Sequence, residues 1–192
     1  MTYLRKFVVS FLLISGICFS QNNRAEAFIC GVHTGLSGLW LNSEFRLYKS
    51  LVLKGELGIE NDFSVGSHYD GAGFIIQPVI TIEPRIYYNL RKRNDAGKST
   101  SRNSGNFVAL KTSYHPDWFV INLDPSYKRI ADLSIVPTWG IRRLIGEHFT
   151  YEMAAGLGYR IVYLEQLDPY YYEGDNRTQY VPYLSLRIGY TF

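Results

Sequence analysis

Apolar and polar residues alternate along several long segments of this chain. The pattern is strictest in residues 51–60, 80–90, 132–142, 149–159 and 182–192. In residues 51–60, leucine, glycine and isoleucine occupy one face, whereas Lys54, Glu56 and Glu60 stand on the other. A period of two over this length predicts β-strands that have one apolar and one polar face.

The alternation alone does not decide which face is the interior. A soluble sandwich or lipocalin-like barrel buries the apolar face, whereas a membrane barrel turns that face outward to lipid. Three features favour the membrane barrel. The polar faces combine small residues with charges of both signs, which suits a narrow lumen, and the segments after residue 80 are long enough to cross a bilayer at a tilt. Aromatic residues also stand near the strand ends of the apolar faces, as in interfacial girdles: Tyr88, Tyr114, Trp139, Phe149, Tyr159, Tyr190 and Phe192.

We expect eight strands, the smallest common size of an outer-membrane barrel. Counting back from a C-terminal strand that ends in the periplasm gives residues 27–35, 37–48, 51–60, 78–90, 105–115, 129–143, 148–163 and 178–192. A tight turn at 35–38 joins the first two strands, although 28–48 also fits one long bent strand. The expected fold is therefore all-β, an antiparallel up-and-down transmembrane β-barrel formed by one domain, residues 21–192.

The strand count assigns each connection to one side of the membrane. Short turns at 48–50 and 145–147 belong on the periplasmic side. Longer segments are expected to face outward: 61–77, 116–128 and 164–177. Residues 91–104 break this rule, because a long basic segment rich in serine and asparagine falls on the periplasmic side.

Residues 1–20 have the features of a cleaved signal peptide. Arg5 and Lys6 form a positive start, residues 7–18 are apolar, and Cys18 and Ser20 supply small residues at the −3 and −1 positions of the cleavage site. This apolar run is too short for a membrane helix, and no later segment reaches the length of about 18–20 residues that one needs. We therefore predict export through the inner membrane to the bacterial outer membrane.

Cleavage would also simplify the charge and the cysteine content of the chain. It lowers the formal net charge from +3 to +1, which gives no electrostatic argument for a nucleic-acid partner. Cys30 would remain as the only cysteine, so an internal disulfide is excluded. On an apolar strand this thiol is expected to be a small packed side chain.

Four segments carry a resemblance to a known family: Glu83–Leu90, Asn103–Phe107, Thr112–Trp118 and Leu186–Phe192. In these segments the chain resembles the small outer-membrane β-barrel proteins of Bacteroidetes. The resemblance implies the barrel fold and the outer-membrane location, and it carries no catalytic residues. Tyr190 and the terminal Phe192 look like the assembly signal that the barrel-assembly machinery reads.

The polar faces hold the largest group of candidate functional residues. We expect five acids and seven bases to form a lumen charge network: Glu44, Arg46, Lys54, Glu56, Glu83, Arg85, Lys111, Asp132, Arg142, Glu152, Arg160 and Arg187. Inside eight strands these side chains should pair, because an unpaired buried charge costs several kcal/mol. Such a network fills a barrel of this size and leaves no open pore. Glu83 and Arg85 share one face, and we expect each of them to find its partners on neighbouring strands.

A catalytic site and a metal site are less well supported. Ser113, His115 and Asp117 stand at an outer strand end, where outer-membrane hydrolases place catalytic groups. Ser113 and His115 are about 7 Å apart along a strand, too far for direct contact. The sequence therefore favours a loop-anchoring turn at this point, and we predict no catalytic residue, metal ion or cofactor. The remaining histidines are scattered without ligand spacing: His33, His68 and His148.

Two further segments are candidates for recognition. Tyr170–Tyr172 lie in a predicted outer loop beside acidic residues, a combination that can bind sugars or protein partners. The basic run Arg91–Arg93, followed by Lys98 and Arg102, suits either anionic lipid headgroups or plain solvent.

The leading hypothesis is a non-enzymatic outer-membrane barrel with a structural or surface-recognition role. Its expected partners are outer-membrane lipids and, during biogenesis, the barrel-assembly machinery. Two alternatives remain open: a lipid-modifying or proteolytic enzyme with a site at the outer rim near His115, and a soluble lipocalin-like carrier. A hydroxyl within hydrogen-bond reach of His115 would favour the enzyme, and an apolar outer belt would argue against the carrier.

Overall fold

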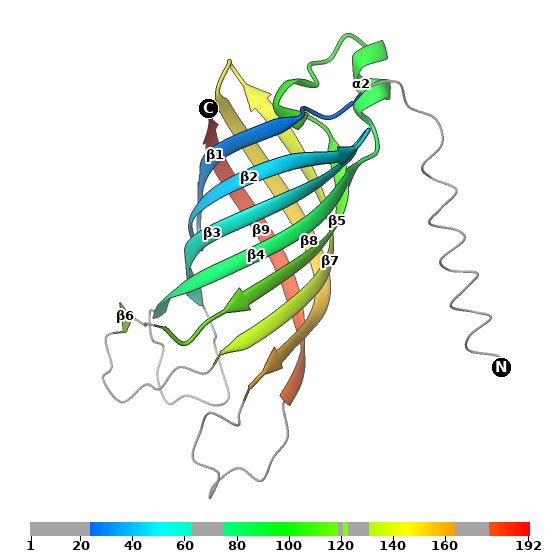
Figure 1. The fold of residues 1–192 in the computed structure, drawn as a ribbon. Helices are drawn as coiled ribbons and strands as arrows, with labels where there is room; N and C mark the ends of the chain where they lie inside the picture. Colours follow the sequence, from blue (N-terminus) through cyan, green and yellow to red (C-terminus); the bar gives the residue numbers. More distant parts are fainter. Residues whose placement is uncertain (1–23, 63–74, 119–120, 123–130, 164–176) are drawn as a thin grey trace, which may run out of the picture.

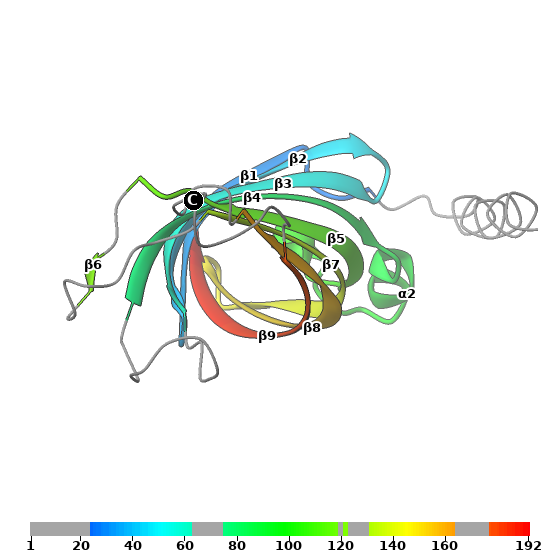
Figure 2. The same cartoon turned by 90° about the horizontal axis from the view of Figure 1, so that it is seen from below.

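Eight long strands close into one antiparallel barrel (Figures 1 and 2). The computed structural model describes residues 24–62, 75–118, 121–122, 131–163 and 177–192. The barrel strands are β1 (Phe28–Gly35), β2 (Gly38–Tyr48), β3 (Leu51–Asp62), β4 (Ile75–Tyr87), β5 (Asn106–His115), β7 (Asp132–Ile145), β8 (Phe149–Val162) and β9 (Arg177–Thr191). Each strand pairs with the next along the chain, and β1 pairs with β9 to close the ring. The two-residue strand β6 (Ile121–Asn122) pairs with the start of β4.

The two ends of the barrel differ. The β2–β3 and β7–β8 turns, residues 88–105, the start of β1 and the C-terminus lie at one end, which we call the turn end (Figure 1). The other four connections lie at the opposite end, which we call the loop end. The predicted outer loops lie largely outside the described residues, and the predicted signal peptide at 1–20 and Tyr170–Tyr172 lie wholly outside them.

All eight predicted strands are present, with bounds that differ from the expected ones by at most three residues. β1 and β2 are separate strands, with Gly35 opposite Gly38 across their tight turn. The alternative of one long bent strand over 28–48 is therefore wrong. In the β7–β8 turn, Gly146 has a φ of 65°, a left-handed conformation that glycine adopts without a steric penalty.

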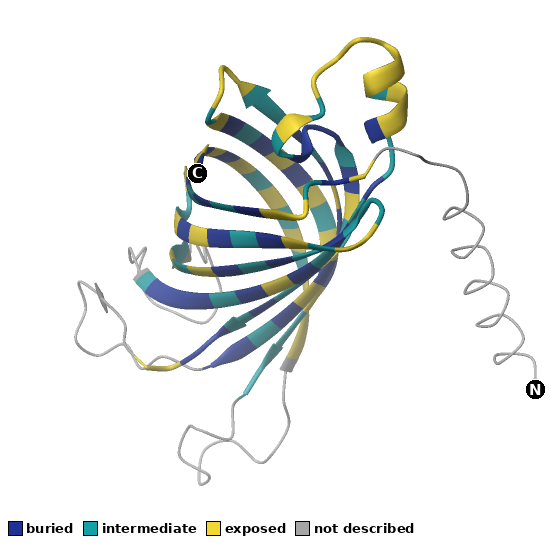
Figure 3. Cartoon of the chain, turned by 45° about the horizontal axis from the view of Figure 1, so that its top comes forward, coloured by how far each residue is buried: buried dark blue, intermediate teal, exposed yellow. Residues whose placement is uncertain are grey.

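The apolar faces of the strands point outward and the polar faces point inward. Ile82 is 55% exposed and Ile135 38%, whereas Glu83 and Arg85 are 3% and 2% exposed. Figure 3 shows this alternation as bands of exposed and buried residues along the strands. The exterior is thus apolar and the interior polar, which is the reverse of the arrangement in a lipocalin-like carrier. In the described part of the chain, no helix combines the length and the apolar character that a membrane span requires.

The main departure from the expected pattern lies between β4 and β5. Strand β4 ends at Tyr87, and Leu90 begins a short helix, α2 (Leu90–Asp95). The alternation placed Leu90 on the outer face, but its side chain is 1% exposed and belongs to a buried apolar cluster with Tyr87 and Phe107. The expected strand over 78–90 is therefore too long at its end, because burying Leu90 at the turn end removes this apolar side chain from the polar boundary of the barrel.

A 3-10 turn, η2 (Ser101–Asn103), fastens the same segment across the turn end. The Asn103 side-chain amide donates to Glu44 inside the barrel at 2.8 Å, and its carbonyl oxygen accepts from the main-chain N–H of Glu26 at 2.8 Å. The main-chain N–H of Arg102 donates to the Glu26 carboxylate at 2.5 Å. Residues 88–105 thus form a cap that is bonded both to the start of the barrel and to its interior.

Candidate functional site: the charged lumen

Arg85 on β4 stands at the centre of the charged lumen. Its guanidinium donates to both carboxylate oxygens of Glu83, at 2.8 and 3.1 Å, and to both of Glu152, at 2.8 and 2.6 Å. Glu44 lies 3.6 Å from the same guanidinium. These acids come from β4, β8 and β2, so one arginine links three strands. A planar guanidinium with several fixed donors is suited to this role.

The direct bond between Glu83 and Arg85 corrects the expectation that each would pair only with neighbouring strands. Both side chains point into a lumen that is narrow at eight strands. Because the two side chains stand two residues apart on one face, the guanidinium of Arg85 can reach Glu83 and Glu152 at the same time.

Glu44 connects the network to the cap at the turn end. It accepts hydrogen bonds from Arg142 at 2.5 Å, from Asn103 at 2.8 Å and from the Tyr87 hydroxyl at 3.3 Å. Arg142 also donates to Nε2 of His33 at 3.3 Å. All five side chains are buried. The carboxylate of Glu44 therefore holds strand β7, strand β4 and the cap together.

Glu56 organises the next group of charges toward the loop end. It accepts from Arg187 at 2.9 and 3.0 Å, and it pairs with Lys54 at 2.6 Å and Lys111 at 3.6 Å. Lys54 also lies 3.4 Å from Glu152. Because Glu152 is a partner of Arg85, the groups around Glu56 and Arg85 form one continuous network.

His115 closes the network at the loop end. Its Nδ1 is 2.8 Å from Asp132 and its Nε2 is 3.3 Å from Glu60. The Trp40 indole N–H donates to the same Glu60 carboxylate at 2.8 Å. Arg160 lies 3.6 Å from Asp132. His115 on β5 thus bridges the carboxylates of Glu60 on β3 and Asp132 on β7.

Aromatic rings stack on the lumen cations. The Arg187 guanidinium lies 3.7 Å from the centre of the Trp40 ring, and that of Arg85 lies 4.1 Å from the centre of the Phe107 ring. Both contacts are short enough for cation–π attraction. The rings therefore pack directly against cations of the ion-pair network.

Of the twelve charges in the predicted network, all except Arg46 and Arg160 are buried. Arg46 is half-buried at the turn end, where it donates to the main-chain oxygen of Ala25 at 2.7 Å. Arg160 is half-buried near the loop end, beside Asp132. These two arginines therefore lie toward opposite ends of the lumen.

Several members of the network were not among the predicted residues: His33, Trp40, Glu60, Tyr87 and Asn103. Glu60 and Tyr87 stand on polar faces of the alternating segments, so periodicity was a usable signal for them. Asn103 carries no such signal, because it lies in an irregular segment.

Ser113 and His115 are hydrogen-bonded to other groups and not to each other. The Ser113 hydroxyl is hydrogen-bonded to the hydroxyl of Thr81 at 2.8 Å. Both ring nitrogens of His115 face carboxylates, and no hydroxyl of a described residue is hydrogen-bonded to them. Asp117 is exposed beyond the end of β5. The structure therefore does not bring the three candidate residues together in the described part of the loop end.

The histidines and the cysteine occupy separate places. His148 stacks on Tyr190 with ring centres 5.2 Å apart, Cys30 is a half-buried free thiol, and His68 lies outside the described residues. No three His, Cys, Asp or Glu side chains in the described ranges are grouped so that they could hold a metal ion.

Tyr190 and Phe192 lie on the exterior at the turn end. They are 39% and 64% exposed, and their ring centres are 5.5 Å apart. Phe149 packs on Tyr190 from the neighbouring strand at 5.4 Å. The main-chain N–H of Phe192 donates to the carbonyl of Cys30 at 3.0 Å, so the C-terminus is bonded to β1 across the seam of the barrel.

Comparison with protein-family models, with curated proteins and with solved structures found no match. The fold and the geometry of the lumen are therefore the basis for a functional proposal.

Proposed function

We propose that this protein is a non-enzymatic outer-membrane β-barrel with a charge-filled lumen and a structural or surface-recognition role. The observation that carries the proposal is the polarity of the barrel, with apolar side chains outside and paired charges inside. Apolar patches larger than a few hundred Å² are rare on the surfaces of soluble monomers. Hydrocarbon is the solvent that suits such an exterior, and a closed barrel leaves no strand edge unpaired within it.

Aromatic side chains near both ends of the barrel support the same proposal. Tyr159 and Tyr180 lie side by side toward the loop end, with ring centres 4.8 Å apart, and Phe149, Tyr190 and Phe192 cluster at the turn end. Membrane barrels carry such girdles at the two interfaces between lipid and water. Leucine and isoleucine occupy the exposed positions between these aromatics: Leu157, Leu184, Leu186 and Ile188.

In this proposal residues 1–20 direct export and are removed, and the loop end faces the cell exterior. The turn end then faces the periplasm, as short connections do in bacterial barrels. Rigid strands would present the segments at the loop end to an external partner. The enzyme alternative gains no support, because Ser113 and His115 are bonded to other groups. The carrier alternative gains none either, because the polar faces are the ones that line the interior.

Site-directed spin labelling tests the membrane proposal. Nitroxide labels are attached to cysteines introduced as Ile82→Cys and Ile135→Cys in a Cys30→Ser background. In lipid vesicles, oxygen should relax these labels more strongly than a water-soluble nickel complex does. The reason is that both side chains point out of the barrel, 55% and 38% exposed. Glu147→Cys, in the exposed β7–β8 turn, is the matched control and should show the opposite preference. A preference for the nickel complex at Ile82 and Ile135 would contradict the proposal.

A second prediction concerns the C-terminus. Deleting Phe192 should reduce the amount of heat-modifiable, folded protein in the outer membrane, because the proposed assembly signal loses its terminal aromatic. Refolding of the purified chain into detergent should change little, since this ring packs only on the outside. Phe149→Ala removes an exposed aromatic of the same cluster away from the C-terminus and should leave assembly levels near those of the wild type. Equal levels after deletion of Phe192 would refute the assembly role.

A further inference from the structure

A basic surface pocket of about 680 Å³ lies at the turn end, between the cap and the ends of β5 and β7. Its lining includes Tyr88, Lys92, Arg93, Lys98, Asn106 and Arg143. Four of these side chains are cationic, and no acidic residue lines the pocket. None of the four cations forms an ion pair with another described residue.

Two of the cations are held in place by main-chain and amide oxygens. Arg93 donates to the carbonyl of Ser99 at 3.0 and 3.3 Å. Arg143 donates to the side chain of Asn106 at 2.6 Å and to the carbonyl of Arg142 at 2.7 Å. These bonds fix the guanidinium groups but leave both positive charges uncompensated. Arg93 and Arg143 line the same pocket, so an anion bound there would be stabilised by both positive charges.

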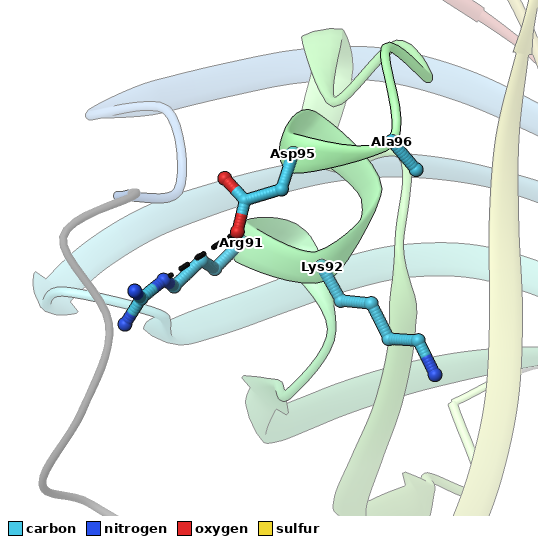
Figure 4. A pocket seen from close by; sticks show the side chains of 4 residues that line it. All are labelled: Arg91, Lys92, Asp95 and Ala96. Atoms are coloured by element: carbon cyan, nitrogen blue, oxygen red, sulfur yellow. Dashed lines mark ion pairs between the residues drawn. The ribbon is translucent and has the colours of Figure 1, made fainter.

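The other side of helix α2 is different. There Arg91 pairs with Asp95 at 3.6 Å, whereas Lys92 extends away from this pair (Figure 4). Arg91 is absent from the lining of the basic pocket. Helix α2 therefore carries one arginine that is paired with a carboxylate, Arg91, and two cations that are not, Lys92 and Arg93. Arg91 can thus serve as the control for substitutions in the pocket.

The pocket opens at the boundary of the apolar exterior. Trp139 is 50% exposed on the outer face of β7, and its indole N–H donates to the Tyr88 hydroxyl at 2.8 Å. Tyr88 itself lines the pocket. In membrane proteins tryptophan and tyrosine mark the level of the lipid headgroups. The four cations thus stand next to the residues that mark this level.

We propose that this pocket binds the phosphate of an anionic phospholipid headgroup in the leaflet at the turn end. The inference rests on the proposed membrane location and adds a ligand class to it. Guanidinium groups can contact two phosphate oxygens at once, and the flexible lysines add point charges. A lipid with a net negative charge should be preferred over a zwitterionic one, because a choline group brings a positive charge into a cationic pocket.

Quenching of Trp139 by brominated lipids tests this site. In a Trp118→Phe background, Trp139 is the one tryptophan on the exterior, because Trp40 is buried in the lumen. Phosphatidylcholine vesicles containing brominated phosphatidylglycerol should quench Trp139 at lower mole fractions than vesicles containing brominated phosphatidylcholine. We expect roughly a fivefold preference, the effect of one well-placed basic residue at a membrane surface.

Two charge-neutralising variants separate the pocket from its surroundings. The double variant Lys92→Gln/Lys98→Gln should bring the preference below about twofold, since it removes two of the four pocket charges. Arg91→Gln, on the same helix but outside the pocket, should keep the full preference. If the two variants lower the lipid preference equally, the assignment of the headgroup site to this pocket is contradicted.

The outcomes distinguish the site from the membrane proposal. If neither brominated lipid quenches Trp139, the membrane location itself is contradicted. If both lipids quench it equally, the barrel is in the membrane but the headgroup site is refuted. If the lipid preference is absent but inorganic phosphate binds the wild-type protein in detergent and does not bind Lys92→Gln/Lys98→Gln, the pocket belongs to a soluble phosphate compound and the lipid is overturned as its ligand.

Discussion

Replacing Arg85 with alanine should lower the free energy of unfolding by about 3–5 kcal/mol, the usual cost of removing one partner from a buried ion pair. Arg85 is 2% exposed and donates four hydrogen bonds to Glu83 and Glu152. Without the guanidinium, two buried carboxylates lose their best donors and repel each other. The loss should appear as a lower midpoint of unfolding when the protein is titrated with urea in detergent. The folded fraction at each urea concentration is measured by heat modifiability on gels.

Arg91→Ala is the control for this substitution. It removes the same type of side chain from an exposed i,i+4 pair with Asp95, for which a change of about 0.3–0.5 kcal/mol is expected. Arg85→Lys keeps a positive charge in the lumen and should fall between the wild type and Arg85→Ala. An Arg85→Ala midpoint as close to the wild type as that of Arg91→Ala would mean that the central network does not stabilise the barrel.

The second large effect is expected in electrical measurements. The wild-type protein in planar bilayers should carry almost no steady ionic current, whereas a 16-stranded porin under the same conditions conducts freely. An eight-stranded barrel is just wide enough for its side chains to fill the interior. Here Glu152 pairs with both Arg85 and Arg142 in the interior, and the Phe107 ring stacks on Arg85.

The porin serves as the positive control for bilayer formation, and protease protection of the barrel shows that the test protein has inserted. A large and steady conductance from the inserted wild-type protein would contradict the filled lumen. Brief, rare openings would not, because the network is built from many separate ion pairs that can exchange partners.

The strands and their faces were predictable from the sequence because alternation is a local property of the chain. A side chain two positions away points in the same direction, so residues such as Ile82 and Glu83 were assigned to opposite faces before any pairing was known. Three further features favoured the inverted barrel: aromatic residues near the strand ends, charges of both signs with small residues on the polar faces, and segments long enough to cross a bilayer. Glycine and short polar stretches then located the turns, among them the one at 35–38.

The ion-pair partners required the tertiary structure. Glu44 and Arg142 are separated by 98 positions in the sequence, and only the register of all the strands and the closure of β1 on β9 bring them together. Alternation identifies the charges that face inward, but it contains no information on which strands lie opposite one another across the lumen. The direct Glu83–Arg85 bond has the same origin, because the width of the lumen decides how far each side chain can extend.

The cap at the turn end marks the limit of the sequence pattern most clearly. Residues 91–104 have no period of two or 3.6, so neither helix α2 nor the entry of Asn103 into the barrel was predicted. Their positions depend on contacts with Glu44 and Glu26, which are distant in the sequence. The sequence by itself determined the strands, the division of their residues between two faces and the charges of the polar face, because each of these follows from neighbouring residues. The tertiary structure decided the pairing of those charges, the buried position of Leu90 and the basic pocket, because each of these depends on segments that meet only when the barrel closes.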